Sequence, residues 1–325
     1  MVRNTQIDSL KFFLIFLVLV GHCLDINIGA KGNSVVFKFI YSFHMPVFAM
    51  LSGFVFRKKD YREYLGGGNL IATYLIFQLL YGGKVLTYKG GSLGDFWLDG
   101  FIYNAKHLYD PADGLWYLLS LYFWRIFLNS TPSRLRDTPL LHFCLTLFVS
   151  FVAGFIPLGR EMSFQRTFAF YPLFVLGFYL KDTYEQLRKT PRAIPLAVIL
   201  IYMAVIACTS IPAVRMLLQR TDYDLSNILY SIMGRGMFYF WTIPISLSVM
   251  AIFPDLRFFS SEGRETMFYY LYHMFFVLLF RYIVISTGME CNIATVIVFA
   301  ITSFGVMKLL INVKALDFLT KPITF

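Results

Sequence analysis

Ten long apolar runs follow one another along the chain, and they constrain its fold more than any other feature. They span residues 10–26, 34–56, 68–88, 114–130, 139–159, 164–180, 193–212, 229–253, 265–287 and 292–313. About 20 apolar residues in a helix cross the hydrocarbon core of a bilayer. Backbone groups in lipid have no water to bind, so each run is predicted to be a helix. The pattern predicts an all-α membrane protein, a bundle of about ten transmembrane helices.

Composition supports a membrane protein and opposes a water-soluble one. Of the 325 residues, 58% are hydrophobic and 15% are charged, against roughly 45–50% and 25% in soluble domains. No second, soluble domain is evident, so residues 1–325 are predicted to form a single integral membrane domain. The first apolar run continues past His22 without a small-residue cleavage site, which indicates an uncleaved first helix.

Basic residues between the apolar runs predict the orientation of the chain. On the side of the amino terminus lie fifteen of them, Arg3, Arg57, Lys58, Lys59, Arg62, Arg134, Arg136, Lys181, Arg188, Lys189, Arg192, Arg257, Arg264, Lys314 and Lys321. On the other side lie six, Lys31, Lys89, Lys106, Arg160, Arg215 and Arg220. Cytoplasmic loops are rich in Lys and Arg, so both termini are predicted to be cytoplasmic, in a cell (inner or plasma) membrane. The net charge of +10 is attributed to loops facing anionic lipid, and no nucleic-acid partner is predicted.

Eight basic residues fall within the predicted spans. They are Lys11, Lys38, Lys84, Arg125, Arg166, Arg235, Arg281 and Lys308. A charge at the centre of a spanning helix costs about 2.5–3.5 kcal/mol, and nearly every acidic residue lies in a loop or at a helix end. The bundle is therefore predicted to hold cations without internal carboxylate partners, although those near helix ends can reach the interface. A water-filled cavity with an anionic ligand would explain the others; contacts to carbonyl oxygens or lipid headgroups are the structural alternative.

The first predicted helix places a cation and a base on one face. Lys11 and His22 are eleven residues apart, which is about three helical turns and about 16 Å along the axis. Asp8 falls near the same face, and Asp25 follows His22 by three residues, where its carboxylate can orient the imidazole ring. Neutral imidazole acts as a base near neutral pH. This face suits a long anionic donor that enters from the cytoplasm and delivers its reactive end to His22.

The longest outer loop, residues 89–113, combines carboxylates with aromatic rings. The carboxylates are Asp95, Asp99, Asp110 and Asp113, and the aromatic rings are Trp97, Tyr103 and Tyr109. Rings stack on sugar faces and carboxylates bind hydroxyls, so the loop suits a carbohydrate; a solvated loop is the alternative. The four cysteines have no metal-like spacing, and neither a metal site nor a disulfide is predicted.

Two motifs near the amino terminus resemble acyltransferase family 3. In the first, Ile7-Asp8-Ser9-Leu10-Lys11 precedes Gly21-His22, with ten residues between the lysine and the histidine; the family more often has Arg in place of Lys11. The second is Phe43-His44-Met45-Pro46 followed by Leu51-Ser52-Gly53-Phe54. Weaker similarities follow in the family's order, at Leu115-Trp116-Tyr117-Leu118, Arg166 with Phe170-Tyr171-Pro172 and Leu176-Gly177, and Gly263-Arg264-Glu265-Thr266-Met267 with Tyr270-Leu271-Tyr272-His273.

The resemblance implies an enzyme that moves an acetyl group from acetyl-CoA to a hydroxyl of a carbohydrate acceptor. It is strongest to short members that O-acetylate sugars of surface polysaccharides in the cell envelope, the fucose O-acetyltransferase type. By this resemblance His22 is catalytic, with Lys11 as its companion. The predicted site is completed by the lining residues Asp8, His44, Ser52, Trp116, Arg166, Arg235 and His273. Acetyl-CoA is a substrate, and no bound cofactor is expected.

The residues and the resemblance together predict a path for the donor. Coenzyme A is polyanionic, so its phosphates are placed toward Lys11, Arg125 and Lys308, on the cytoplasmic half. The pantetheine arm then reaches His22, which acts either as a general base or as an acyl carrier. A transporter or flippase for an anionic solute is the alternative, although the chain shows no paired repeats. A structural or assembly subunit without chemistry is a third interpretation, which leaves the histidines unexplained.

Overall fold

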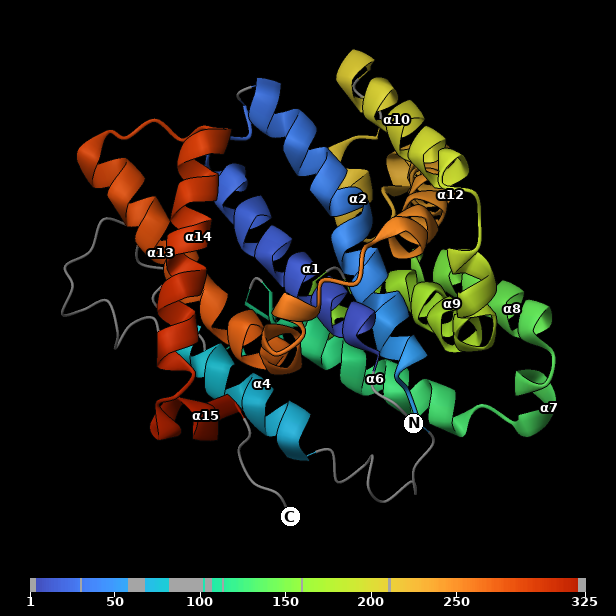
Figure 1. Cartoon of the computed structure of the whole chain (residues 1–325). Coiled ribbons are helices and arrows are strands. Elements are labelled where there is room, and N and C mark those ends of the chain that lie inside the picture. The colour runs from blue at the N-terminus through green and yellow to red at the C-terminus, as the bar shows by residue number, and fades with distance from the viewer. Residues whose placement is uncertain are drawn as a thin grey trace.

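Each predicted apolar run overlaps a helix in the computed structural model of the chain (Figure 1). In chain order these helices are α1 (Thr5–Leu24), α2 (Lys31–Phe54), α4 (Gly68–Leu80), α6 (Trp116–Ser130), α8 (Pro139–Ala153), α9 (Phe164–Arg188), α10 (Ala193–Cys208), α12 (Ile228–Ile252), α13 (Thr266–Thr287) and α14 (Ile293–Leu310). Three shorter ones are α7 (Ser133–Arg136), α11 (Val214–Leu218) and α15 (Lys314–Thr320). The structure describes residues 4–29, 31–57, 68–81, 102, 107–112, 114–158, 160–209 and 212–320, and no strand occurs within them. The all-α prediction is confirmed for these residues.

Helix length separates five clear membrane spans from the other predicted ones. Within the described residues, five helices are long and apolar enough to cross a membrane, over residues 5–27, 32–54, 225–252, 262–287 and 293–310. The helices α9 and α10 meet at a bend of 110°, and together they add a sixth candidate span. Helix α4 has 13 residues and α8 has 15, which at about 1.5 Å per residue falls short of a hydrocarbon core of about 30 Å. The structure thus supports five or six spans, against the ten expected from apolar runs alone.

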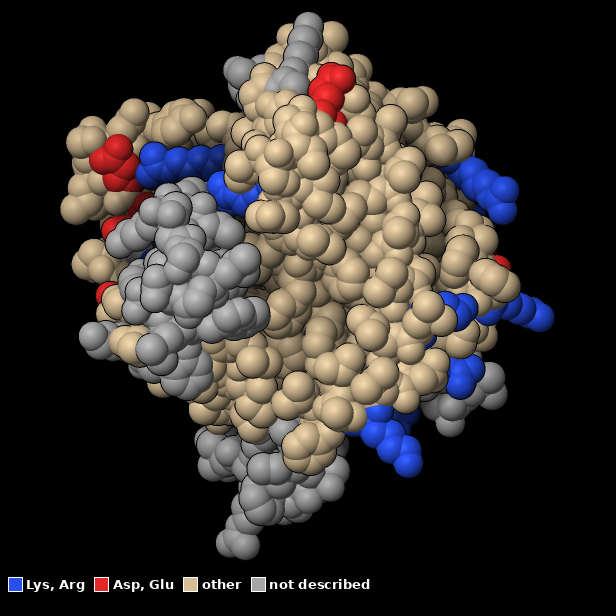
Figure 2. Space-filling view, turned by 90° about the vertical axis from the view of Figure 1, so that its left-hand side faces the viewer, with Lys and Arg blue, Asp and Glu red and all other residues tan. Residues whose placement is uncertain are grey.

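Large apolar side chains lie on the outside of the bundle, as lipid contact requires. Leu140 of α8 is 76% exposed, and Leu309 of α14 is 74% exposed. Figure 2 shows one face whose centre carries no charged side chains, with Lys and Arg residues toward its margins. A water-soluble protein rarely exposes apolar patches of this extent. The surface is therefore that of a protein embedded in lipid.

Helices α1 and α2 occupy the middle of the bundle. Helix α1 packs against α2 on one side and against α13 and α14 on the other, while α2 also packs against α9 and α12 (Figure 1). The core is correspondingly central, and Leu10, Leu14 and Leu19 of α1 are fully buried. Side chains on the facing surfaces of α1 and α2 therefore meet inside the protein.

Two glycines bring α2 and α9 into backbone contact. A Cβ atom at Gly53 of α2 would lie 1.8 Å from the carbonyl oxygen of Phe174 in α9, and one at Gly177 of α9 would lie 1.9 Å from the carbonyl oxygen of Met50 in α2. Small residues allow helices in membranes to approach this closely, so that packing contacts form along both backbones. The glycines of the Ser52-Gly53 and Leu176-Gly177 motifs therefore serve helix packing.

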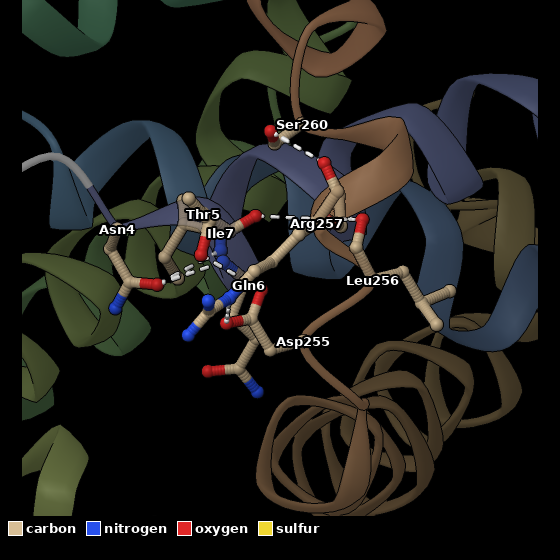
Figure 3. Close-up of polar contacts among 9 residues, drawn as sticks. Asn4, Thr5, Gln6, Ile7, Asp255, Leu256, Arg257 and Ser260 are labelled. Carbon is tan, nitrogen blue, oxygen red and sulfur yellow. Dashed lines mark hydrogen bonds and ion pairs between the residues drawn. The ribbon is translucent and has the colours of Figure 1, made fainter.

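The start of α1 is anchored to the segment that follows α12 (Figure 3). Asn4 caps the helix by accepting hydrogen bonds from the backbone N–H groups of Gln6 and Ile7. The Gln6 side chain donates to the carbonyl of Phe253 at 2.6 Å, and Thr5 donates to Asp255 at 2.8 Å. These bonds fix the position of α1 along its own axis, which places Lys11 and His22 at defined depths.

The α2–α9 contact predicts a destabilising substitution with a matched control. The change Gly177→Ala forces a methyl group against the backbone of α2, so the two helices must separate. We expect a loss of about 1–3 kcal/mol, the usual cost of overpacking a core. Gly305→Ala is the control, because Gly305 in α14 has no atom within 4 Å of its Cβ position.

Thermal unfolding of the purified protein in detergent measures both glycine variants. A fall in the midpoint for Gly177→Ala with an unchanged or raised midpoint for Gly305→Ala supports the close crossing. Equal midpoints for the two variants would contradict it.

Candidate functional site

A cavity of about 390 Å³ lies at the carboxyl end of α1. It is lined by Val18, His22, Asp25, Ile28, Ser34, Phe37, Tyr41, His44, Met45, Gly114, Trp116, Arg166, Phe170, Val214, Leu217, Leu218, Arg220 and Tyr270. These residues come from α1, α2, α6, α9, α11 and α13 and from the segments beside them. We call it the His22 cavity. Five of the residues predicted from the sequence, those at positions 22, 25, 44, 116 and 166, border it directly.

Three histidines from three helices gather around this cavity. The ring centroids of His22 and His273 are 5.5 Å apart. Tyr41 connects the third, because its ring lies 6.4 Å from that of His22 and 4.7 Å from that of His44, edge to face in both cases. Residues 22, 44 and 273 are far apart in the chain, and the structure brings their rings near one another; His22 and His44 border the cavity, whereas His273 does not.

Two of the histidines are held in a defined tautomer. The Nδ1 atom of His44 lies 2.7 Å from the carbonyl oxygen of Ile40, and Nδ1 of His273 makes the same kind of contact with the carbonyl of Tyr270. A carbonyl only accepts hydrogen bonds, so Nδ1 carries the proton and Nε2 presents a lone pair. Nε2 of His273 is buried and has no hydrogen-bond partner within the described part of the chain. The His273 ring is fully buried and borders neither cavity, so this nitrogen is a buried acceptor.

Gly114 forms the wall of the cavity over His273. Its φ of 85° is in the left-handed region, which glycine adopts without the strain that other residues incur. A Cβ atom there would lie 3.4 Å from Cε1 of His273, and the Tyr270 hydroxyl donates a hydrogen bond to the Gly114 carbonyl. The turn before α6 and the histidine on α13 are therefore positioned by one another.

Arginines line the wall opposite α1. Arg166 of α9 donates from Nε to the carbonyl of Leu218 at 3.1 Å, and its guanidinium lies 4.8 Å from the centroid of the Trp116 ring. Arg220 lines the same cavity. A small adjoining space of about 20 Å³ is bordered by Trp116, Arg166 and Arg220 together with Arg160 and Asp110. Arginines therefore predominate among the charged residues of this wall and of the adjoining space.

A second cavity, of about 130 Å³, lies beside Lys11. It is lined by Lys11, Met45, Phe48, Leu51, Ser52, Tyr117, Leu118, Leu121, Thr266, Met267 and Tyr270. We call it the Lys11 cavity. Met45 and Tyr270 border both cavities, so this pair of side chains lies between the two spaces. The sequence places Lys11 and His22 on one face of α1, and the structure puts a cavity at each.

Two predicted unpaired cations turn out to be ion-paired, so that prediction is wrong for them. Lys11 lies 3.4 Å from Asp8, one turn earlier on α1, and Lys308 lies 2.5 Å from Glu262. Glu262 belongs to a single turn of 3-10 helix, η7 (Glu262–Glu265), which packs against α1. Close packing of η7 depends on Gly263, since a Cβ atom there would lie 1.8 Å from the carbonyl oxygen of Asp8. A linear pattern of apolar runs does not reveal such a turn.

Arg235 is explained by structural contacts, the alternative raised from the sequence. It is buried in α12 and donates to Gln219 at 2.9 Å, to the carbonyl of Ser150 at 2.5 Å and to Gln165 at 3.0 Å. It does not border the His22 cavity or the Lys11 cavity. Its role is to join α8, α9 and α12 rather than to line the predicted site.

The predicted donor-binding residues divide between one that borders a cavity and two that do not. Lys11 borders the Lys11 cavity. Arg125 lies on α6 one turn beyond Leu121, which does border it. The Lys308 side chain is 59% exposed and forms its ion pair with Glu262. Asp8, predicted to line the site, borders neither cavity and instead pairs with Lys11.

Sequence reasoning missed several residues of the site, and it could not test the outer loop. Tyr41 and Arg220 carry no motif signal, because one lies in an aromatic-rich helix and the other was counted only as a basic loop residue. Met45 and Tyr270 lie within the motifs of the resemblance, but no role was predicted for them.

Of the predicted sugar-contact loop, residues 89–101, 103–106 and 113 lie outside the described residues. Asp110, which is described, forms an ion pair with Arg160 at 3.5 Å.

Comparison with known proteins gives one strong result. A family model described as an acyltransferase domain matches residues 4–311, nearly the whole chain. No curated protein and no solved structure matches the chain.

The contacts of Arg235 predict a loss of stability when it is replaced. The change Arg235→Leu leaves three buried acceptors without their donor, and an unsatisfied buried acceptor costs about 1–3 kcal/mol. Removal of a buried charge offsets part of this, so we expect a net loss of about 2 kcal/mol.

Arg215→Leu is the control for Arg235→Leu, since Arg215 on α11 is exposed. Surface changes of this kind stay within about 0.5 kcal/mol. Thermal unfolding in detergent distinguishes the two. An Arg235→Leu protein as stable as the wild type would remove the structural role.

Proposed function

The chain belongs to acyltransferase family 3, and on that premise we propose that it moves an acetyl group from cytoplasmic acetyl-CoA to a hydroxyl of a cell-surface or lipid-linked glycan. It is a multi-pass membrane protein. We place both termini in the cytoplasm of a cell (inner or plasma) membrane, on the basic residues of its loops. In this orientation the Lys11 cavity lies on the cytoplasmic half and the His22 cavity on the outer half.

The position of Met45 and Tyr270 between the two cavities is the observation that carries the proposal. Most of the side chains that line the Lys11 cavity are apolar, such as Phe48, Leu51 and Leu121. A narrow apolar lining suits the long pantetheine arm of coenzyme A. The ammonium of Lys11 has three donor hydrogens, of which Asp8 occupies one. We place a phosphate or carbonyl of the donor against this ammonium, because Lys11 borders the cavity. The thioester then passes Met45 and reaches His22.

His22 performs the transfer by accepting the proton of the acceptor hydroxyl. The hydroxyl oxygen attacks the thioester carbon, a C–O bond forms, the C–S bond breaks, and the proton passes to the departing coenzyme A thiolate. Asp25, at the mouth of the cavity, orients the His22 ring, as carboxylates orient catalytic imidazoles elsewhere. His273, whose ring lies 5.5 Å from that of His22, packs behind His22 and holds it in position.

A covalent route uses the same residues. The His22 nitrogen attacks the thioester carbon, the C–S bond breaks and coenzyme A leaves as a thiolate. The hydroxyl oxygen then attacks the acetyl carbon, the C–N bond breaks, and the proton of the hydroxyl passes to the imidazole and on to the thiolate. The proximity of His22 and His273, at 5.5 Å between rings, favours neither route. A trapped acetyl-enzyme distinguishes the covalent route from direct transfer.

A transporter for an anionic solute is the second candidate. Two neighbouring cavities within a bundle, separated by Met45 and Tyr270 and with arginines beside one of them, also suit a conduction path. Membership of an acyltransferase family favours transfer. Uptake of an anion without consumption of acetyl-CoA would favour transport.

Removal of the His22 imidazole is the first test of the proposed activity. We expect His22→Ala to lower transfer by about 10²–10⁴-fold, the usual contribution of a general base. Label from radioactive acetyl-CoA is followed into glycan in isolated membranes. His142→Ala is the control, because His142 of α8 bonds to the Tyr179 hydroxyl at 2.8 Å and borders neither cavity.

Retained transfer in His22→Ala would remove the catalytic assignment. Unfolding midpoints of both histidine variants show that a loss of activity is not a loss of folding. Transfer lost equally in His142→Ala would point to a general defect.

Obstruction of the junction is the second test of the proposed activity. Met45 is 9% exposed and borders both cavities, so Met45→Trp fills the connection with an indole ring. We expect at least about tenfold slower transfer, because misplacing the thioester by about 1 Å costs up to 10²-fold. Met233→Trp is the control, since Met233 is 58% exposed on α12.

The smaller variant Met45→Phe should give an intermediate rate of transfer. Transfer at the wild-type rate in Met45→Trp would rule out a donor path through this junction.

A further inference from the structure

The basic wall of the His22 cavity has charge in excess of what the proposed chemistry uses. Arg166 and Arg220 border the cavity, and Arg160 borders the adjoining space. Asp110 pairs with Arg160 at 3.5 Å. No carboxylate contacts Arg166 or Arg220 among the described residues. Within the same residues, Asp25 is the only carboxylate that borders the His22 cavity. Two guanidinium groups thus face a cavity that supplies them with one carboxylate.

Two neighbours hold the Arg166 side chain in one orientation. Its Nε donates to the Leu218 carbonyl, and its plane lies over the Trp116 ring at 4.8 Å. A guanidinium has five N–H donors in a rigid fork, and this contact uses one. The others suit a carboxylate or phosphate, which a guanidinium binds through two parallel hydrogen bonds.

The arginines lie on the far side of the junction from Lys11. Arg220 follows α11 and borders the His22 cavity but not the Lys11 cavity. If the nucleotide end of the donor lies at Lys11, its phosphates are separated from Arg220 by Met45 and Tyr270. An anion at the arginines then belongs to the other substrate, which enters from the outer half.

We propose that the acceptor glycan bears a negatively charged group, a carboxylate or a phosphate, that binds between Arg166 and Arg220 while its hydroxyl lies at His22. This inference rests on the proposed function and extends it to the class of acceptor. Trp116 borders both the cavity and the adjoining space, and its indole offers an apolar surface to the sugar ring. The two arginines select for charge, and the histidines act on the hydroxyl.

The labelled product tests the charge of the acceptor directly. Wild-type membranes are incubated with radioactive acetyl-CoA, and the labelled glycan is applied to an anion-exchange column at neutral pH. We expect retention of the label until salt is added. Elution of all label in the neutral fraction would overturn the proposal.

The source of the charge follows from two treatments of the retained product. Mild acid, which cleaves sugar diphosphates, abolishes retention if the anion is the phosphate of a lipid-linked sugar. Reduction of carbodiimide-activated carboxylates abolishes it if the anion is a sugar acid. Either result supports an anionic acceptor and names its source. If retention survives both treatments, the purified product is analysed for phosphate, and absence of phosphate overturns the proposed carboxylate or phosphate.

A binding experiment assigns the anion to the arginines. Inorganic pyrophosphate and coenzyme A are titrated separately into the purified full-length protein in detergent. We expect Arg220→Gln to weaken pyrophosphate binding by about tenfold or more, the effect of losing a charge-assisted hydrogen bond, and to leave coenzyme A binding unchanged. Lys11→Gln should do the reverse. Arg215→Gln is the control, since Arg215 is exposed and borders neither the His22 cavity nor the Lys11 cavity.

The outcomes separate this inference from the proposed function. Absence of saturable pyrophosphate binding, or an equal loss in Arg215→Gln, overturns the acceptor site. A parallel loss of coenzyme A binding in Arg220→Gln assigns the arginines to the donor and also overturns it. If wild-type membranes transfer no acetyl group at all, the proposed function fails, whatever the pyrophosphate result.

Discussion

The close crossing of α2 and α9 is the contact on which the site depends. Gly53 and Gly177 allow two backbones to touch, and a single added methyl group on either has no room. Helix α2 carries Tyr41, His44 and Met45, and α9 carries Arg166. If the two helices were held further apart, the basic wall would withdraw from the histidines and the His22 cavity would widen. In a membrane the hydrophobic effect does not drive helices together, so such close packing is a main source of helix association.

Helix α1 relates the two cavities to each other. Its start is anchored by Asn4, Thr5 and Gln6 (Figure 3), so Lys11 and His22 keep their depths. Three turns of helix separate them, and the remaining walls come from α2, α6, α9, α11 and α13. Met45 and Tyr270 then decide whether the two spaces communicate. A rigid helix with one functional group near each end suits a substrate that must reach across the protein.

Buried arginines in this protein have two distinct environments. Arg235 is surrounded by neutral acceptors on α8, α9 and the segment before α12, and it joins these helices. Arg166 is held by one carbonyl and one aromatic ring at the edge of a cavity. The sequence shows both as a single cation in an apolar run and predicts the same role for them. Only the neighbours, which come from distant parts of the chain, separate a structural cation from one that faces a ligand.

The sequence by itself determined the helices, because apolar runs of sufficient length have no other stable form in lipid. It also determined that Lys11 and His22 share a face, since their spacing is a property of one helix. The number of long spans, the ion pairs of Lys11 and Lys308, and the junction at Met45 and Tyr270 were decided by tertiary structure. The prediction of unpaired cations was wrong for Lys11 and Lys308 because a charge count ignores local geometry, and Glu262 reaches Lys308 through a turn that no periodicity marks. Residues such as Tyr41 and Arg220 became part of the site for the same physical reason: contacts between helices are set by packing in three dimensions, whereas a sequence pattern records only neighbours along the chain.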